Sequence, residues 1–318
     1  MRHRFTALAS LLLAVVLAIA GCGGASGPPD PYQLLNDSTK ATWNPIQINI
    51  GMTFKFQGET ITLDPKNIAM VVDNASQKFG FHVSIPAASL GIPAGSLGSL
   101  GIDGDSIDFD MVYNGDGLFM RSAIMKPTLQ MILGPIGRLP RGDLTGWLKL
   151  GTKEELAALS ALAAAGGTAS PPPGAINDVS KKSFEEAGIS LTTAAAVEKR
   201  NGVDAQHITL AIDTAKLASN PAFSAGAGSG AQAAQAIALV KALSISGDIW
   251  VESSTKRILE LDTHIAPASD ATQGGDVTIT AHDPDGSVSL EAPSSSTDVP
   301  LGILVSEMMK LVSGGSVS

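Results

Sequence analysis

Aromatic residues are scarce in this chain of 318 residues. It contains 9 Phe, 3 Trp and 2 Tyr, and its formal net charge is −9. Proteins that bind single-stranded nucleic acid stack the bases on aromatic side chains, and a negative protein surface repels a phosphate backbone. The sequence therefore argues against nucleic acid as a partner. It also predicts a core built mainly from aliphatic side chains, methionine and alanine.

Motifs for catalysis and for cofactors are also missing. No Walker loop, dinucleotide-binding motif or HExxH occurs, and none of the five histidines has another His or Cys at metal-ligand spacing. The acidic cluster Asp103 to Asp110 lacks the glycine and the closing glutamate of a calcium loop, so a solvated turn is the better interpretation. Residues 94–98 miss GxSxG by one position and lack the flanking strand and helix. We expect no enzyme, no metal and no cofactor.

Long hydrophobic runs are absent, with one short exception at the N-terminus. Residues 7–20 are apolar and follow Arg2 and Arg4, a pattern typical of a secretion signal and too short for the ~20 residues of a membrane span. The run ends in Ile19-Ala20-Gly21-Cys22. This end resembles the bacterial lipobox, in which cleavage precedes the cysteine and acyl chains such as palmitate are attached to it.

Cys22 is the only cysteine, so it cannot form an intramolecular disulfide. We expect residues 1–21 to be a lipoprotein signal peptide, Cys22 to be the lipid anchor and residues 22–30 to be a flexible tether. The protein would then lie on the extracytoplasmic face of the cell membrane. An ordinary signal peptide followed by an unrelated cysteine is the alternative.

Alternating hydropathy is the clearest pattern in the rest of the chain. In residues 46–56 the odd-numbered side chains include Gln47, Asn49 and Lys55, and all the even-numbered ones are apolar. This alternation predicts a strand with one apolar face. Further strands are predicted at residues 59–63, 67–73, 79–85, 106–113, 117–123, 190–199, 204–212, 246–252, 257–265, 275–282 and 286–291. Asn114-Gly115 is a favoured hairpin turn.

Helices are predicted in groups between these strands. The predicted ranges are residues 31–42, 152–166, 178–187 and 231–243. Hairpin strands with separate groups of helices indicate an α+β fold with a single large antiparallel sheet. Residues 164–176 and 223–231 are rich in Ala, Gly, Pro or Ser, and we interpret them as loop insertions in one domain over residues 31–318.

The apolar face of this sheet is the candidate site. Either a filled core or an apolar cavity could use it; methionine adapts to ligands of irregular shape and favours the cavity. The candidate lipid-binding residues are Ile46, Ile48, Ile50, Met52, Phe54, Met111, Tyr113, Met120, Met125 and Met131.

A family resemblance adds to this interpretation. The lipobox, the long alternating strand, the hairpin at residues 108–121 and the late segments 247–252, 255–259, 276–280 and 287–293 together resemble actinobacterial lipoproteins of the LppX and LprG type. That family is similar in fold to the LolA and LolB lipoprotein carriers. The resemblance implies a curved sheet, helices over its concave face and an enclosed lipid-sized apolar cavity.

The same resemblance implies a function. The protein would bind and carry or present acylated lipids or glycolipids, with a membrane transporter as a further partner. The alternative is a non-enzymatic envelope interaction protein with a filled core.

Overall fold

The structure is a computed structural model. It describes residues 28–41, 43–56, 59–93, 95–100, 102, 104–157, 181–221, 223, 231–270, 273–299, 302–303 and 305–306. The predicted signal peptide, Cys22, most of the tether and nearly all of both predicted insertions lie outside these residues.

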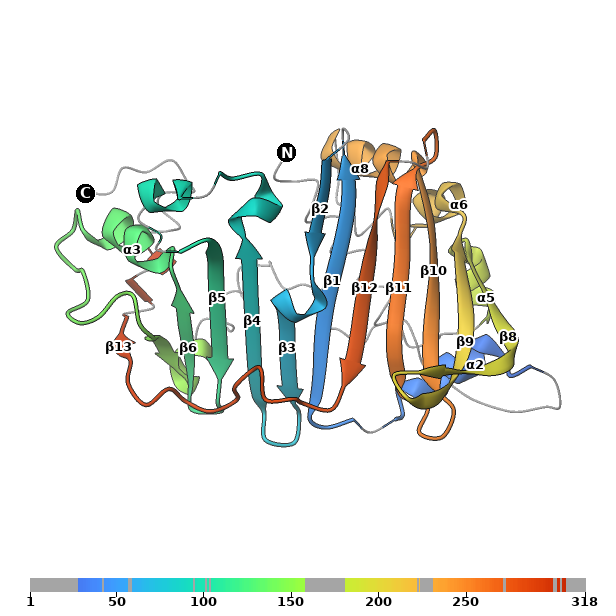
Figure 1. The fold of residues 1–318 in the computed structure, drawn as a ribbon, viewed down its shortest axis with the longest axis horizontal. Helices are drawn as coiled ribbons and strands as arrows, with labels where there is room; N and C mark the ends of the chain where they lie inside the picture. Colours follow the sequence, from blue (N-terminus) through green and yellow to red (C-terminus); the bar gives the residue numbers. More distant parts are fainter. Residues whose placement is uncertain are drawn as a thin grey trace. The chain divides into compact units, whose positions relative to one another are not determined.

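In the part of the chain that the structure describes, thirteen strands form one sheet, which is antiparallel except where β13 pairs with β7. The strand order is β13-β7-β6-β5-β4-β3-β1-β12-β11-β10-β9-β8, and β2 pairs with β1 (Figure 1). The bounds are β1 Ile46–Phe56, β2 Glu59–Leu63, β3 Ile68–Asp73, β4 Lys78–Pro86, β5 Ser106–Tyr113, β6 Gly117–Ser122, β7 Leu148–Thr152, β8 Ile189–Arg200, β9 Val203–Ile212, β10 Leu243–Glu252, β11 Ile258–Pro267, β12 Gly274–His282 and β13 Thr297–Asp298. The predicted α+β fold with a large antiparallel sheet is confirmed.

Short helices and 3-10 turns connect the strands. They are α2 Pro31–Ser38, α3 Met125–Leu133, α5 Lys181–Glu186, α6 Thr214–Ser219, α8 Ala231–Lys241, η1 Pro65–Asn67, η2 Ala87–Leu90 and η3 Ser96–Leu100. Asp30 begins α2 as an N-cap, because its carboxylate accepts a hydrogen bond of 3.0 Å from the backbone N–H of Tyr32. Thr152 and Glu155 form a capping box at the start of the predicted helix 152–166. Within the part of the chain that is described, no helix is long and apolar enough to cross a membrane.

The chain divides into two compact units. Unit 1 comprises Met1–Trp43, Met52–Thr62 and Pro171–Ala281, and unit 2 comprises Asn44–Gly51, Leu63–Ser170 and His282–Ser318. We describe each unit by itself.

Unit 1 has a filled apolar core. Apolar side chains of β8 to β11 pack against α2 and α5. Figure 1 shows these two helices beside the strands. Leu35 of α2, Ile208 of β9 and Val251 of β10 are fully buried, and the rings of Tyr32 and Phe184 meet edge to face with centroids 5.6 Å apart. These two helices therefore close the apolar side of the unit 1 strands.

Unit 2 is packed differently on its two sheet faces. Residues 283–296, which follow β12 and which we call the strap, lie over the face that carries Ala69 and Val71 (Figure 1). Val288 and Leu290 of the strap pack against these two buried side chains. The strap therefore covers one face of the unit 2 strands.

The strap corrects one prediction. Residues 286–291 were expected to form a strand after β12, but they form none. The reason is that β12 already has β11 and β1 as neighbours, so no free edge remains beside it for a hairpin partner. The chain crosses a sheet face instead.

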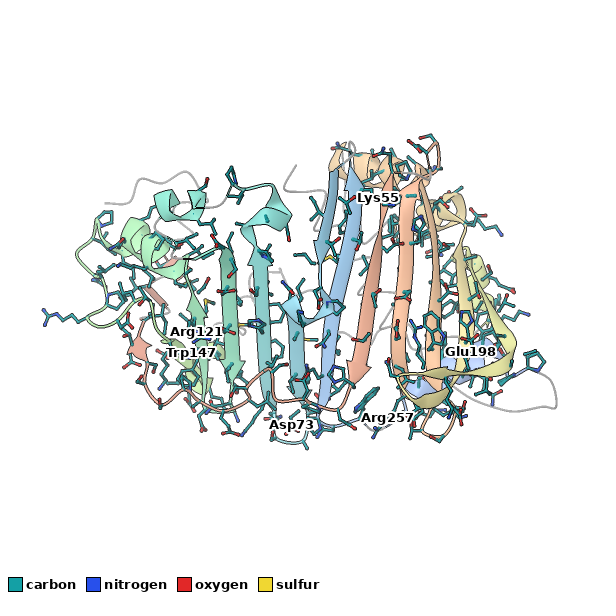
Figure 2. The ribbon with its side chains drawn as sticks, in the orientation of Figure 1. Lys55, Asp73, Arg121, Trp147, Glu198 and Arg257 are labelled. Atoms are coloured by element: carbon teal, nitrogen blue, oxygen red, sulfur yellow. The ribbon has the colours of Figure 1, made fainter. Side chains whose placement is uncertain are left out.

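Gln47 is a second correction. It was assigned to a polar, outward face of β1, but it is fully buried. Its side-chain NH₂ donates to Asn49 Oδ1 and to Ser287 Oγ, each at 3.1 Å, and its carbonyl oxygen accepts from the backbone N–H of Asp285 at 3.1 Å. The Gln47 amide can be buried because both its nitrogen and its oxygen have hydrogen-bond partners. Lys55 of unit 1, in contrast, is exposed (Figure 2).

Candidate functional site

The other face of the unit 2 strands carries rows of large apolar side chains. Cross-strand pairing places Ile48, Met70, Phe81, Met111 and Met120 in one row across β1, β3, β4, β5 and β6. The next row is Ile46, Val72, Phe79, Tyr113 and Leu118. We call these ten side chains, together with Phe109, the apolar face.

Every member of the apolar face is half-buried, and none is fully buried. On the strap-covered face, by comparison, Val71 and Val112 are 1% and 3% exposed. The same strands therefore bury their apolar side chains on the strap-covered face, Phe119 of β6 included, and leave those of the apolar face partly accessible. Large, partly accessible apolar surfaces are typical of binding sites.

Aromatic rings lie in the middle of the apolar face. Phe79 and Phe81 are stacked with centroids 6.4 Å apart, and Phe81 meets Phe109 edge to face at 6.0 Å. Five adjacent strands at about 4.8 Å spacing give the face a width of about 19 Å. One leaflet of a bilayer has a hydrocarbon thickness of about 15 Å, so an acyl chain could lie across the strands.

Two packed elements border the apolar face. At β6, Leu118 and Met120 pack against the cluster around Leu129 and Leu133 of α3. At β5, Ile107 packs against Leu97 of η3 in a smaller cluster. Within residues 86–104, where the sequence predicted no helix or strand, η2 and η3 form and Leu97 is buried. The apolar side chains of this segment pack at the β5 border of the apolar face.

The structure brings most of the predicted site residues together. Ile46, Ile48, Met111, Tyr113 and Met120 lie on the apolar face, and Ile50 shares their side of β1. Met125 packs at the α3 border. The remaining three predicted residues lie elsewhere: Met52 and Phe54 in unit 1, and Met131 on the exposed side of α3.

Sequence reasoning missed the contributions of β3 and β4 to this face. Met70, Val72, Phe79 and Phe81 were not assigned to it, and neither were Phe109 of β5 and Leu118 of β6. The signal was available in residues 79–85, which alternate as clearly as β1 does, whereas residues 68–72 are apolar throughout and do not show which side chains share a face. The pairing register that aligns those alternations was not available from the sequence.

Polar groups gather on the opposite sides of the strands. In unit 2, Asp110 accepts from Arg121 at 2.8 and 3.0 Å, and its other oxygen lies 2.8 Å from His82 Nδ1. The Arg121 guanidinium also lies 5.1 Å from the ring centroid of Trp147 (Figure 2). Asp108 accepts from Ser84 and Ser106. These residues satisfy one another, as expected for a structural network.

Unit 1 has its own polar network around Trp250. The His207 ring stacks on Trp250 at 4.9 Å, and the Arg200 guanidinium lies 4.2 Å from the Trp250 ring centroid. Arg200 binds the buried carboxylate of Glu260 through two nitrogens, and this bond raises the pKa of Arg200. His207 Nε2 lies 2.6 Å from Asp248. Among the described residues, no group of His, Cys, Asp or Glu is arranged to hold a metal ion.

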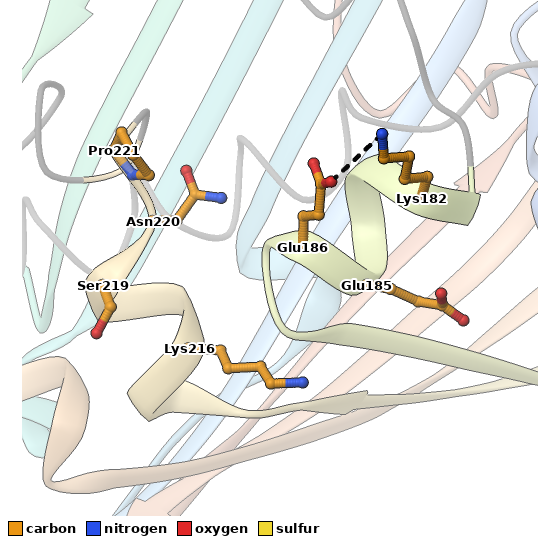
Figure 3. A pocket seen from close by; sticks show the side chains of 7 residues that line it. All are labelled: Lys182, Glu185, Glu186, Lys216, Ser219, Asn220 and Pro221. Carbon is orange, nitrogen blue, oxygen red and sulfur yellow. Dashed lines mark ion pairs between the residues drawn. The ribbon is translucent and has the colours of Figure 1, made fainter.

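Two open depressions of unit 1 are lined mainly by residues with charged or polar side chains. The first, about 510 Å³, lies between α5 and α6 and includes the ion pair of Lys182 and Glu186 at 3.7 Å (Figure 3). The second, about 460 Å³, lies at the turns near Lys199 and Ser253. Neither is lined by a predicted site residue, and charged linings of this kind do not suit an acyl chain.

Comparison with known proteins finds no family model and no curated protein that matches this chain. Among solved structures, the chain is similar to MucB in complex with MucA(peri), with a TM-score of 0.26 and 9% identity, covering 84% of this chain and 61% of that one. It is similar to a DUF1329 family protein from Desulfovibrio piger ATCC 29098, with a TM-score of 0.23 and 9% identity, covering 81% and 94%.

A domain assigned to outer membrane lipoprotein sorting, from Vibrio parahaemolyticus, is similar at a TM-score of 0.23 and 9% identity, covering 80% of this chain and 92% of that one. At these TM-scores we draw no conclusion about family or function from the three likenesses.

Proposed function

We propose that this protein is a membrane-anchored, extracytoplasmic lipoprotein that binds acylated lipids or glycolipids on the apolar face of unit 2 and carries or presents them. The observation that supports the proposal is the half-burial of eleven large apolar side chains on one face of five strands. The N-terminal lipobox-like sequence supports the anchor and the compartment. The activity is binding rather than catalysis.

The energetics of a carrier suit a partly accessible face. Moving an acyl chain of ~16 carbons out of water is worth on the order of 10 kcal/mol, at about 0.8 kcal/mol per methylene. Relative to a membrane the same transfer is worth almost nothing, because the chain is already in hydrocarbon. A carrier therefore needs a surface about as favourable as the bilayer, and adaptable side chains such as Met70, Met111 and Met120 provide one.

The test is lipid occupancy, measured with a matched pair of variants. Met111→Gln keeps the side-chain length but places an amide on the apolar face, where it would meet an acyl chain without a partner. Met131→Gln makes the same change at a side chain that is 66% exposed and points away from the face. Native mass spectrometry of protein from membranes, and titration with a fluorescent fatty acid in solution, report occupancy.

We expect the parent to hold lipid, Met111→Gln to lose at least about 1 kcal/mol of fatty-acid affinity, and Met131→Gln to bind the fatty acid like the parent. Equal binding by all three proteins would place the lipid elsewhere. No lipid in the parent by either method would favour the filled-core interaction protein, an arrangement that unit 1 already shows under α2 and α5.

A further inference from the structure

Exposed apolar side chains are concentrated in one short segment of unit 2. Large hydrophobic side chains that are exposed in the described residues are Ile61, Ile124, Met131, Leu139, Val197 and Val203. Three of these six lie between residues 124 and 139, with exposed fractions of 40%, 66% and 36% for Ile124, Met131 and Leu139. This part of the chain therefore places apolar groups in water at an unusual density.

These exposed side chains are not part of the apolar core of unit 2. Helix α3 buries Leu129, Ile132 and Leu133 completely or almost completely on its inner side. Met131 is about 100° of helical rotation from Ile132 and 160° from Leu129, so it lies on the outer side. Its exposure is therefore a property of the surface and not of incomplete packing.

The charge of the same segment is opposite to the charge of the chain. Between Asp116 and Asp143 there is no acidic residue, but there are four basic ones. Arg121 is bound to Asp110. The charge of Lys126 acts on Asp143 and, after hydrogen bonds, helps to lower the pKa of that carboxyl. Lys126, Arg138 and Arg141 are nevertheless exposed and form no ion pair within 4 Å with another residue that the structure describes. In a chain with a formal net charge of −9, this is a local positive surface next to exposed apolar side chains.

We propose that residues 124–141, which we call the basic-apolar patch, dock this protein onto the surface of an anionic lipid bilayer. Lys126, Arg138 and Arg141 would lie at the negative headgroups, and Ile124, Met131 and Leu139 would enter the boundary between headgroups and acyl chains. Segments that combine exposed apolar side chains with cations bind membranes in this way. The protein as a whole is repelled by such a surface, so the patch also sets the orientation of unit 2.

Docking through the basic-apolar patch would add a lipid-transfer step to the proposed function. Only this transfer step rests on the proposed function; the docking itself does not. Met125 of α3 packs in the same cluster as Leu118 and Met120 of the apolar face. Docking through α3 would bring the β6 border of the apolar face close to the bilayer. A lipid could then move between the bilayer and the apolar face with little exposure to water.

The experiment measures binding to vesicles by sedimentation. The full chain after residue 21, carrying Cys22→Ser so that no acyl anchor contributes, is mixed with vesicles of phosphatidylcholine alone or of phosphatidylcholine and phosphatidylglycerol. We expect binding to the anionic vesicles only, weakened by NaCl at about 0.5 M. Replacing Lys126, Arg138 and Arg141 by Gln should weaken it on the order of a hundredfold, and Met131→Asp about tenfold.

The control variants make comparable changes to exposed cationic and apolar side chains of unit 1. Lys181→Gln with Lys182→Gln removes two exposed cations, and Val197→Asp places a charge on a side chain that is 52% exposed. Both controls should bind anionic vesicles nearly as the parent does. Equal binding by patch and control variants, or equal binding to both kinds of vesicle, would overturn the proposal. So would a parent dimer that Met131→Asp converts to a monomer without any change in vesicle binding.

Fatty-acid titration in solution separates this proposal from the proposed function. The patch variants should bind fatty acid like the parent, and Met111→Gln should bind anionic vesicles like the parent. If the protein docks on vesicles but never binds fatty acid, the docking proposal stands and the proposed lipid-carrier function is wrong. If it binds fatty acid but does not dock, the lipid-carrier function stands and the docking proposal is wrong.

Discussion

Gln47 and Ser287 are joined by a hydrogen bond of 3.1 Å although 240 residues separate them in the sequence. Through this bond and the one from the Asp285 N–H, the first strand of the sheet holds the strap. Asp285 is fixed in turn by Ser287, whose side chain and N–H lower the pKa of the Asp285 carboxyl. One buried amide thus organises the turn at which the strap begins.

Replacing this amide should destabilise unit 2. Gln47→Ala leaves the Asp285 N–H and the Ser287 hydroxyl without their buried partner and creates a small cavity, so we expect a loss of about 2–3 kcal/mol in the free energy of unfolding. Urea denaturation measures it. Gln130→Ala, an exposed position on α3, is the control and should change the value by less than about 0.5 kcal/mol. A similarly small effect at Gln47 would mean that the strap is not held by this residue.

Gly80 tests the close approach of the strap to β4. A Cβ atom at this position would lie 2.4 Å from the Ser289 carbonyl oxygen and 2.7 Å from Val288 Cγ1. Gly80→Ala should therefore displace the strap and cost about 1–3 kcal/mol. Gly98→Ala is the matched control, since a Cβ there would meet nothing within 4 Å. Thermal melts that do not distinguish the two variants would contradict this packing.

Asp73 should contribute to stability in a defined pH range. Hydrogen bonds, first from the side chain and N–H of Ser76 and then from Asn44, lower the pKa of Asp73 from 3.8 to about 2. A folded-state pKa below the unfolded value means that the stabilisation is complete above about pH 4 and is lost as the pH falls through about 2.

The Asp73 carboxyl can be followed directly by NMR. Ser76→Ala removes the largest cause of the shift and should move the pKa of Asp73 up toward 3.8. Asp73→Asn should melt at a temperature that changes less between pH 4 and pH 2 than that of the parent. An unchanged titration in Ser76→Ala would refute the assigned cause.

The pair of Arg200 and Glu260 should behave as a buried ion pair. Glu260 is 6% exposed, so Arg200→Ala would leave its carboxylate buried without a partner, at a cost of about 3–5 kcal/mol. Arg200→Met combined with Glu260→Leu removes both charges and should recover most of this loss. Urea unfolding followed by tryptophan fluorescence measures the stability of both variants. A double variant as unstable as Arg200→Ala would show that packing on Trp250, and not the charge pair, dominates.

Cys22 is predicted to be the membrane anchor. Cys22→Ser removes the thiol that would be acylated, so the protein should move from the membrane fraction to the soluble extracytoplasmic fraction. Its thermal melt should equal that of the parent, because the residue is expected on the tether. If the Cys22→Ser variant stayed in the membrane fraction, Cys22 would not be the anchor. If its melting temperature changed, Cys22 would belong to the folded part of the protein.

The strands could be predicted because their alternation is local information. β1, β4 and β5 were expected within one residue of their observed bounds. β7 was missed because its sequence, Leu-Lys-Leu-Gly-Thr, is short and runs into the capping box at Thr152. Helix α6 was also not predicted, since its six residues carry too little periodicity.

What covers each face could not be predicted. A period of two residues shows that Ile48 and Gln47 point to opposite sides of β1, but not which side is closed. The strap decides this point, because it buries the side with the polar amide and leaves the fully apolar side accessible. That outcome depends on contacts made by residues more than 230 positions away, which local patterns do not encode.

The position of the strap also has a consequence for the order of folding. A chain that emerges N-terminus first presents Ala69, Val71 and Gln47 long before Val288 and Ser287 arrive. Until then these side chains have no cover, and contacts of such long sequence separation form slowly. Unit 2 therefore completes its folding only after nearly the whole chain has been delivered, so its strands stay without the strap for most of synthesis.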